Sequence, residues 1–189
     1  GHHDLAAVRI TTMKLAAAAF VALIAVFAVF FTGPVDPILT SIDIASSPER
    51  VWPVLSDFAS WGEWNPIFDV EPSTPRPQVG TWLKITCTWT DGSVDGAEEE
   101  IEVYEEGRKM CWHVKLVKPH PWVVIPMPKW LLAADRCIEI AEVEPGITRV
   151  RNYYKPGAIL GKMVIMFKRS VLEPGFNAFN AALKAKIES

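Results

Sequence analysis

The sequence predicts an α+β fold in which an antiparallel sheet lies against one long C-terminal helix, with a single apolar helix in front of this domain. Apolar and polar residues alternate with a period of two in several short runs between residues 83 and 154, as they do in half-buried strands. Residues 160–187 carry apolar side chains at helical spacing, and residues 15–31 carry no polar side chain. A sheet with one apolar face must cover that face, and the terminal helix is the element long enough to do so.

The apolar run from Leu15 to Phe31 predicts a single membrane-spanning helix at residues 15–32. A helix of this length extends about 25 Å, which is near the lower limit for crossing the hydrocarbon layer of a bilayer. Lys14 precedes the run, and no Lys or Arg follows it before Arg50. By the positive-inside tendency we expect a single-pass membrane protein with its N-terminus in the cytoplasm and its domain on the exported side.

Two alternatives compete with this anchor. A cleaved secretory signal would release the domain as a secreted protein, but Phe30 and Phe31 stand where a signal peptidase prefers small side chains. A buried helix of a soluble protein is the second alternative. Residues 1–14 form a separate N-terminal segment that has no part in the fold prediction. Residues 38–189 are enough for one ordinary domain with a single core.

The predicted domain begins with a strand and two short helices. Residues 38–45 are rich in β-forming side chains. Ser47 and the proline after it suit the cap and the first turn of a helix over residues 49–55. A second short helix over residues 57–64 ends before Pro66, because the residue before a proline disfavours helical geometry.

A run of strands joined by tight turns follows. In the clearest strand, Leu83 and Ile85 alternate with polar residues, which gives one apolar and one polar face. The further strands are expected at residues 94–104, 110–116, around 138–140 and 148–154, with turns at Asp91-Gly92, Glu106-Gly107 and Pro145-Gly146. The last element is the helix over residues 160–187, which Pro174 should kink or divide. If the sheet curves around this helix, the space between them becomes a cavity.

The three cysteines allow two interpretations. Cys87, Cys111 and Cys137 lack the close pairs of a zinc site, and buried free thiols are the simpler interpretation. If the segments around Cys111 and Cys137 form a hairpin, its centre is (111 + 137)/2 = 124, inside the Pro-rich stretch Pro119 to Pro128. The two thiols would then face each other across neighbouring strands and form a disulfide in an oxidising compartment.

Several stretches of the domain resemble the START-like (SRPBCC) superfamily, in its polyketide cyclase/dehydrase and lipid-transport branch. The most specific is the opening from Ile42 to Phe58, with Trp64-Asn65-Pro66 after it. Weaker similarities are found at Val79-Gly80-Thr81, Gly146 to Val150 and Phe176 to Lys184. The resemblance covers residues 38–188 and implies a helix-grip fold, in which a seven-stranded antiparallel sheet wraps around the long helix and leaves a deep pocket for an apolar small molecule. It implies no particular reaction, because lipid carriers, metabolite binders and aromatase/cyclases share this architecture.

Polar residues among apolar neighbours are the candidate ligand contacts. Counting by twos puts Arg136 on one face with Ile138, and Asn152 on one face with Tyr154, and we expect these faces to line the pocket. Such groups could orient a ligand carboxylate or carbonyl. Alternatively, Arg136 pairs with an internal carboxylate or lies at the rim, and Asn152 bonds to backbone. Three tryptophans are further candidates, with simple core packing as the alternative: Trp64, Trp89 and Trp112.

No catalytic residue, metal site or cofactor is predicted. His113, on the polar face of its strand, and His120, in a Pro-flanked loop, have no further ligand at metal-binding spacing, so both are expected at the solvated surface. The acidic run Glu98 to Glu100 is likewise expected on a solvated face. The net charge of -3 and the scattered Lys and Arg residues argue against a nucleic-acid partner, which would require a concentrated basic face.

Three functions are compatible with the sequence. The leading one is a membrane-anchored START-like domain that binds a lipid, an isoprenoid or an aromatic metabolite, so its partners would be this hydrophobic molecule and the membrane. The second is an enzyme of the polyketide cyclase or dehydratase type, in which Arg136, Asn152 or Tyr154 polarises a carbonyl. The third is a non-catalytic cell-envelope interaction protein whose interior is filled by its own side chains and whose loop from Trp122 to Trp130 contacts a protein or the membrane.

Overall fold

A computed structural model of the chain describes residues 20–22, 33–120 and 123–189, with the side chains of a few further residues left undescribed. The chain divides into two compact units, Gly1–Pro34 and Val35–Ser189. Within the described residues, no helix combines the length and the apolar character needed to cross a bilayer. Most of the predicted span at residues 15–32 lies outside the described part.

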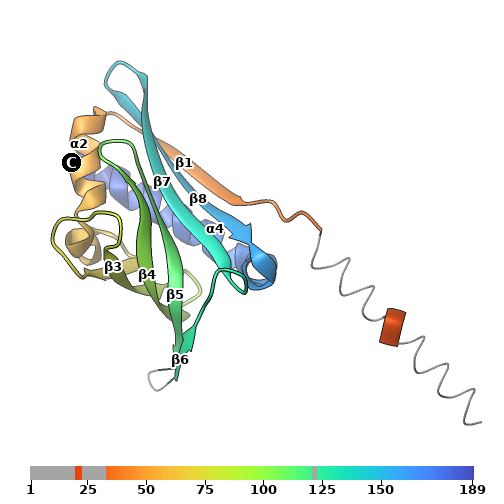
Figure 1. Cartoon of the computed structure of the whole chain (residues 1–189). Coiled ribbons are helices and arrows are strands. Elements are labelled where there is room, and N and C mark those ends of the chain that lie inside the picture. Colours follow the sequence, from red (N-terminus) through yellow and green to blue (C-terminus); the bar gives the residue numbers. More distant parts are fainter. Residues whose placement is uncertain (1–19, 23–32, 121–122) are drawn as a thin grey trace, which may run out of the picture. The chain divides into compact units, whose positions relative to one another are not determined.

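The second unit is an eight-stranded antiparallel sheet combined with helices (Figure 1). The sheet has the order β1-β8-β7-β5-β4-β3-β2, and β6 pairs with β5 off this path. The strands are β1 (Ile38–Ile44), β2 (Phe68–Pro72), β3 (Trp82–Thr88), β4 (Val94–Glu105), β5 (Lys109–His120), β6 (Val123–Pro126), β7 (Ala133–Glu144) and β8 (Ile147–Gly157). The expected seven strands thus gain a short eighth one, β6.

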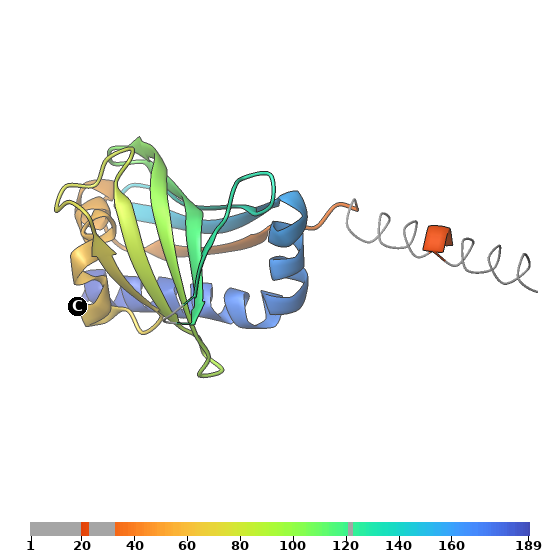
Figure 2. The same ribbon diagram turned by 60° about the horizontal axis from the view of Figure 1, so that its bottom comes forward.

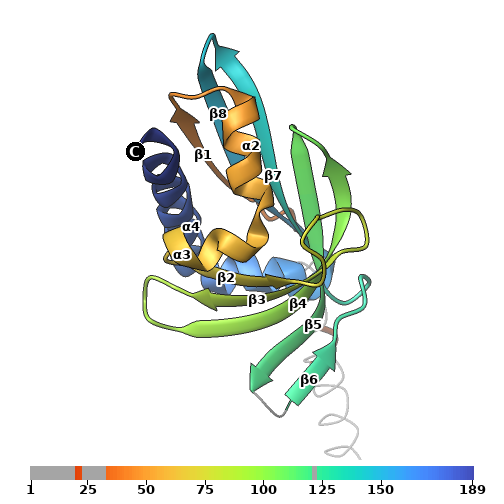
Figure 3. The same cartoon turned by 90° about the vertical axis from the view of Figure 1, so that its left-hand side faces the viewer.

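The sheet curls around one long helix, α4 (Ala158–Glu188), as the view in Figure 3 shows. The helix is continuous through Pro174, and Figure 2 shows that it bends rather than divides. A proline removes one hydrogen bond of the helix and favours such a bend. The inner side of α4 buries apolar residues against the sheet: Ile165, Leu172, Phe176, Phe179 and Leu183. The predicted helix-grip architecture of this domain is confirmed.

Three short helical elements follow β1: α2 (Pro48–Ser56), the 3-10 helix η1 (Phe58–Ser60) and α3 (Trp61–Trp64). Ser47 occupies the N-cap position of α2, but its side chain makes no capping hydrogen bond. Its backbone carbonyl accepts one from the Arg50 N–H at 3.0 Å instead. After α3, the Asn65 side chain fixes the path into β2, because its Oδ1 accepts hydrogen bonds from the backbone N–H groups of Ile67 and Phe68 at 2.8 and 3.2 Å.

A disulfide joins Cys111 on β5 to Cys137 on β7. The two residues are direct partners in the pairing of these strands, with their Cα atoms 4.1 Å apart. The structure therefore confirms the cross-strand alternative for this pair, and among the described residues Cys87 alone is a free thiol.

The prediction of a solvated His113 is wrong, because this residue is 0% exposed. It lies on the outward face of β5, one alternate position from Cys111, and its Nδ1 is 3.1 Å from Oδ1 of Asp135 on β7. The Cys111–Cys137 disulfide and the Asp135 side chain therefore lie beside His113 on the outward face of the sheet. Both faces of β5 are therefore buried here, which a single strand's alternation does not reveal.

Candidate ligand-binding cavity

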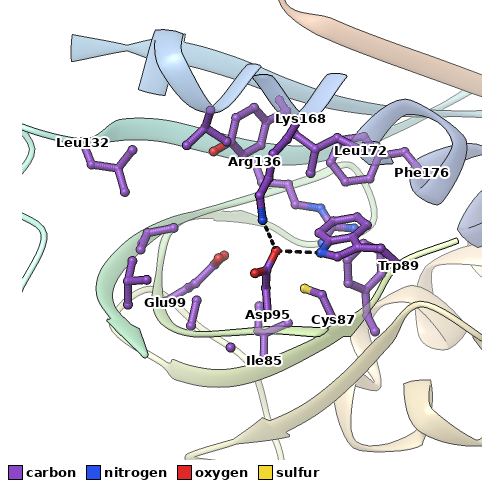
Figure 4. A pocket seen from close by; sticks show the side chains of 17 residues that line it. Ile85, Cys87, Trp89, Asp95, Glu99, Leu132, Arg136, Lys168, Leu172 and Phe176 are labelled. Carbon is purple, nitrogen blue, oxygen red and sulfur yellow. Dashed lines mark hydrogen bonds and ion pairs between the residues drawn. The ribbon is translucent and has the colours of Figure 1, made fainter. Parts of the chain in front are cut away.

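A cavity of about 220 Å³ lies between the concave face of the sheet and α4. Its wall combines residues from β2, β3, β4, β5, β7, β8 and α4 (Figure 4). The apolar members are Phe68, Ile85, Trp89, Ala97, Val114, Val117, Leu132, Val164, Leu172 and Phe176. The expected interior space is thus present, and its lining is mainly hydrophobic, as in most sites for small organic molecules.

Arg136 is the charged group that lies deepest in this wall. It comes from β7, and its register partners Tyr154 on β8 and Trp112 on β5 flank it. The residue is only 5% exposed. Its guanidinium carbon lies 3.8 Å from the centre of the Phe68 ring and 4.9 Å from that of Phe176. A cation over the faces of aromatic rings gains electrostatic stabilisation, so these rings form a cage around the charge.

The guanidinium of Arg136 has no counterion among the described residues. Its Nε and Nη2 atoms are buried without a hydrogen-bond partner. Across the described residues, no carboxylate oxygen forms a salt bridge with it. Burial lowers the pKa of Arg136 to about 10, although the nearby Cys87, Glu99 and Tyr154 act in the opposite direction. The group therefore remains protonated at neutral pH, and it is neither at the rim nor paired, contrary to the alternative interpretation.

Glu99 is one of two carboxylates that line the same cavity, and Asp95 is the other. Glu99 pairs with Leu83 of β3 and Val114 of β5, two inward-facing residues. Burial raises the pKa of Glu99 to about 7, while the positive charge of Arg136 lowers it. Glu99 is therefore half-buried in the wall of the cavity, and the predicted solvated face does not extend to it. The sequence contains a signal for this placement, because Glu99 is two positions before the apolar Ile101, and residues two apart in a strand share a face.

A cluster of three polar groups borders the cavity where α4 crosses the sheet. Asp95 on β4 accepts hydrogen bonds at its Oδ2 from Trp89 Nε1 at 2.8 Å and from Lys168 Nζ on α4 at 2.5 Å (Figure 4). The side chains of Asp95 and Lys168 are 45% and 44% exposed. This ion pair therefore lies at the solvent-accessible border and links the helix to the sheet. Trp89 is held from its other side, since a Cβ on Gly175 would lie 2.8 Å from its ring.

The structure brings only some of the predicted contact residues together. Trp89, Arg136 and Tyr154 line the cavity. Trp112 lies behind this wall, with its ring centre 5.2 Å from the Arg136 guanidinium carbon. Trp64 and Asn152 do not line the cavity. The Trp64 ring packs against Trp61 and Phe179, and Asn152 is 0% exposed, with both polar side-chain atoms buried and unpartnered.

The described part of the chain holds no group of three or more His, Cys, Asp or Glu side chains placed to bind a metal ion. Besides the Asp95–Lys168 ion pair at the border, the polar groups that line the cavity are thus a cation, a carboxyl group of raised pKa, a thiol and a phenol in an apolar wall. Burial raises the pKa of the Cys87 thiol to about 12 and also raises that of Tyr154. Both groups therefore stay neutral at physiological pH and contribute polarity rather than charge.

A curled antiparallel sheet that grips a C-terminal helix and leaves a lined cavity between them defines the START-like class of proteins. The chain belongs to the polyketide cyclase / dehydrase and lipid transport family, whose sequence model matches residues 38–188. A search of curated proteins gave no significant match. The resemblance seen in the sequence is thereby confirmed for the family and for the superfamily.

Solved structures agree with this fold at low sequence identity. Protein Ms6760 from Mycobacterium smegmatis superposes with a TM-score of 0.62 and 14% identity, over 80% of this chain and 90% of that one. A START superfamily protein from the same species superposes with a TM-score of 0.56 and 14% identity, over 80% of this chain and 97% of that one. The Zhui aromatase/cyclase from Streptomyces sp. R1128 superposes with a TM-score of 0.59 and 11% identity, over 81% of this chain and 93% of that one. At such identities the similarity establishes the architecture and leaves the chemistry open.

Proposed function

We propose that this protein is a membrane-anchored binding module that holds a hydrophobic small molecule, such as a lipid, an isoprenoid or an aromatic metabolite, in the cavity between the sheet and α4. The observation that carries the proposal is the cavity itself, which is mainly apolar and contains the buried Arg136 cation, whose Nε and Nη2 have no hydrogen-bond partner among the described residues. Its volume of about 220 Å³ is below the roughly 300–1,000 Å³ of sites for drug-sized ligands. The ligand is therefore small, or only part of it is enclosed.

In this proposal the wall and the polar groups have separate roles. Burial of the apolar body of the ligand against rings such as Phe68 and Phe176 supplies most of the binding free energy, at roughly 25 cal/mol per Å² removed from water. The unpartnered N–H groups of Arg136 then fix the orientation of a polar group on the ligand. Of the other predicted contacts, Trp89 and Tyr154 would touch the ligand directly, whereas Trp64, Trp112 and Asn152 would act by shaping or supporting the wall.

Membrane attachment is supported by the sequence and by the surface of the domain. The apolar run ends at Phe31, and the four residues from there to Val35 span at most about 14 Å. The carbonyl of Asp36 accepts a hydrogen bond from Arg169 on α4. If residues 15–32 are inserted in a bilayer, the chain therefore enters the domain close to the bilayer surface.

The same end of the domain exposes large apolar side chains. Phe167 on α4 is 72% exposed, and Trp130 is 78% exposed. Trp130 lies next to Leu131, whose carbonyl accepts a hydrogen bond from the Leu160 N–H in the first turn of α4 at 3.1 Å. Figure 2 shows the start of α4, this connection and the start of β1 at one end of the domain. We assign this surface, Trp130 with Phe167, to contact with the bilayer interface, where aromatic side chains are favoured.

Ligand binding can be tested with a cavity-filling variant. Ala97→Phe adds a ring inside the cavity, and Thr86→Phe adds the same ring on the exposed face of the neighbouring strand β3. Native mass spectrometry of detergent-extracted full-length protein should detect a co-purified small molecule in the wild type and in Thr86→Phe, and not in Ala97→Phe. Equal occupancy in all three proteins would place the ligand elsewhere and refute the proposal.

Membrane attachment needs separate tests. Alkaline phosphatase fused after Ser189 should be active if the domain is exported, and activity of a cytoplasm-only reporter would reverse the topology. In lipid nanodiscs, an environment-sensitive dye at Phe167→Cys should report an apolar surrounding. The same dye at Val79→Cys should remain in water, because Val79 is 60% exposed. It belongs to the loop between β2 and β3, which is drawn in yellow at the opposite end of the domain in Figure 2. Equal signals that grow with protein concentration would indicate contact between copies instead.

An enzyme of the cyclase or dehydratase type is the second candidate, and Glu99 is the observation that favours it. A carboxyl group with a pKa near 7 is suited to proton transfer at neutral pH, and the Arg136 cation in the same cavity could polarise a carbonyl. If this candidate is right, Glu99→Gln should abolish the conversion of a polyketide-like substrate while the substrate still binds. If the wild type binds the polyketide-like substrate without converting it, the enzyme candidate is refuted and the binding function stands.

A further inference from the structure

The charges that face the cavity are unevenly balanced. Asp95 of β4 and Lys168 of α4 neutralise each other through their 2.5 Å contact at the border. Deeper in the cavity lie the Arg136 cation of β7 and the Glu99 carboxyl group of β4, which interact electrostatically without a salt bridge between them. The remaining titratable groups of the wall are the Cys87 thiol of β3 and the Tyr154 phenol of β8, both held neutral by burial. His113 lies on the opposite face of β5.

The form of the unpartnered group indicates what would bind to it. Nε and Nη2 are adjacent nitrogens of one guanidinium edge, and both lack an acceptor. Two parallel N–H donors of this kind match the two oxygens of a carboxylate in a bidentate pair. A neutral carbonyl or hydroxyl would satisfy one donor and leave the buried charge uncompensated, and an uncompensated buried charge is strongly unfavourable.

We propose that the ligand is an amphiphilic monoanion, a carboxylate on an apolar body, that its oxygens accept hydrogen bonds from Nε and Nη2 of Arg136, and that Glu99 takes up a proton when it binds. This inference rests on the proposed binding function and adds the charge of the ligand to it. The proton uptake follows from electrostatics. A ligand anion next to Arg136 competes with the Glu99 carboxylate for the same positive charge, so the neutral form of Glu99 is favoured in the complex.

The coupling has a definite sign. Below pH 7, Glu99 is already protonated in the ligand-free protein, so the anion binds without a further cost. Above pH 7, each complex must capture a proton from solution, and the affinity for the anion falls by up to about tenfold per pH unit. Between pH 6 and pH 8.5 the affinity should therefore decrease about 30-fold, provided that the complex holds its proton throughout this range. A neutral ligand of the same shape should show no such dependence.

Two matched probes test this inference on the full-length protein in detergent: 2-naphthoate, which is anionic over the whole pH range, and the neutral 2-naphthalenemethanol. Fluorescence titrations at pH 6 and pH 8.5 should show tighter binding of naphthoate at pH 6 and the 30-fold loss at pH 8.5, with the alcohol unchanged. Calorimetry in buffers of different ionisation enthalpy should show uptake of one proton per naphthoate at pH 8.5.

Two variants separate the groups involved. Glu99→Gln should bind naphthoate equally well at both pH values, and Arg136→Gln should lose the preference for naphthoate over the alcohol. If the wild type binds both probes equally at pH 6, the anion preference is overturned while the binding function stands. If it binds neither probe and Ala97→Phe does not alter co-purification of a small molecule, the binding function itself fails. A preference for naphthoate without pH dependence would overturn the role of Glu99.

Discussion

Replacing Arg136 with methionine should stabilise the ligand-free protein while it removes the anchor for the ligand. Burial lowers the pKa of Arg136 to about 10, which by the relation between pKa and free energy costs folding roughly 3 kcal/mol. The side chain is protonated in the folded and the unfolded state at pH 7, so the whole cost is present there and declines only above about pH 10. Methionine has a similar length and no charge. Loss of the ring contacts removes up to about 2 kcal/mol of stabilisation, which leaves a net gain of about 1 kcal/mol or more.

Urea unfolding of the ligand-free protein at pH 7, followed by tryptophan fluorescence, measures this difference. Arg151→Met is the matched control, because Arg151 lies exposed on β8 and its loss should change the free energy of unfolding by less than about 0.5 kcal/mol. If Arg136→Met is less stable than the wild type by 1 kcal/mol or more, the cation is well compensated in the ligand-free fold, for example by ordered water. That result would remove the reason to expect a ligand anion.

Three further predictions concern stability. Because burial raises the pKa of Glu99 from 4.5 to about 7, the folded state binds more protons than the unfolded state in this interval, and stability falls as the pH rises through it. Glu99→Gln should therefore stabilise the protein by about 2–3 kcal/mol at pH 8 and have little effect at pH 4.5 in urea titrations, and equal effects at both pH values would contradict this reasoning. Gly175→Ala should destabilise the protein by about 1–3 kcal/mol in thermal unfolding, because the new methyl group would displace Trp89, and any stabilisation would show that the ring moves freely. Replacing Cys111 and Cys137 with alanine should lower the free energy of unfolding by about 2–4 kcal/mol and make it insensitive to dithiothreitol, and an unchanged response to the reductant would argue against the bond.

The fold of the domain was predictable because its elements have clear periods. The alternation of Leu83 and Ile85 with polar residues marks a strand that is buried on one side, and the structure shows this pattern in β3. The helical spacing after residue 160 marks the one element able to cover the concave face of the sheet. Even the disulfide could be predicted as an alternative, since the midpoint of a hairpin fixes which residues are opposite each other.

The site was less predictable, because a single strand's pattern does not show what covers each face. His113 lies on the polar face of its strand by alternation, yet it is buried and contacts Asp135 of the neighbouring strand β7. Glu99 is two positions from Ile101 and so shares its face, whereas the run of three consecutive glutamates indicates by composition alone a solvated face. Asn152 has an inward parity and is buried, but it lies outside the cavity. The alternation of odd and even positions in a strand shows which face of the sheet a residue lies on, whereas the position of a cavity depends on the curvature of the whole sheet.

The energetics of the cavity argue that its charges serve binding rather than folding. A wall of Phe, Trp, Ile and Val side chains would be more stable with two apolar residues in place of Arg136 and Glu99, since each ionised form loses roughly 3 kcal/mol on burial. Neither loss is offset by a direct salt bridge between the two, and the aromatic cage recovers only part of the cost for the cation. Residues that break the usual rules of core packing in this way are expected where a protein binds or reacts. An anion that completes the guanidinium fork and leaves Glu99 neutral would reduce both losses at once, so ligand and proton should bind together.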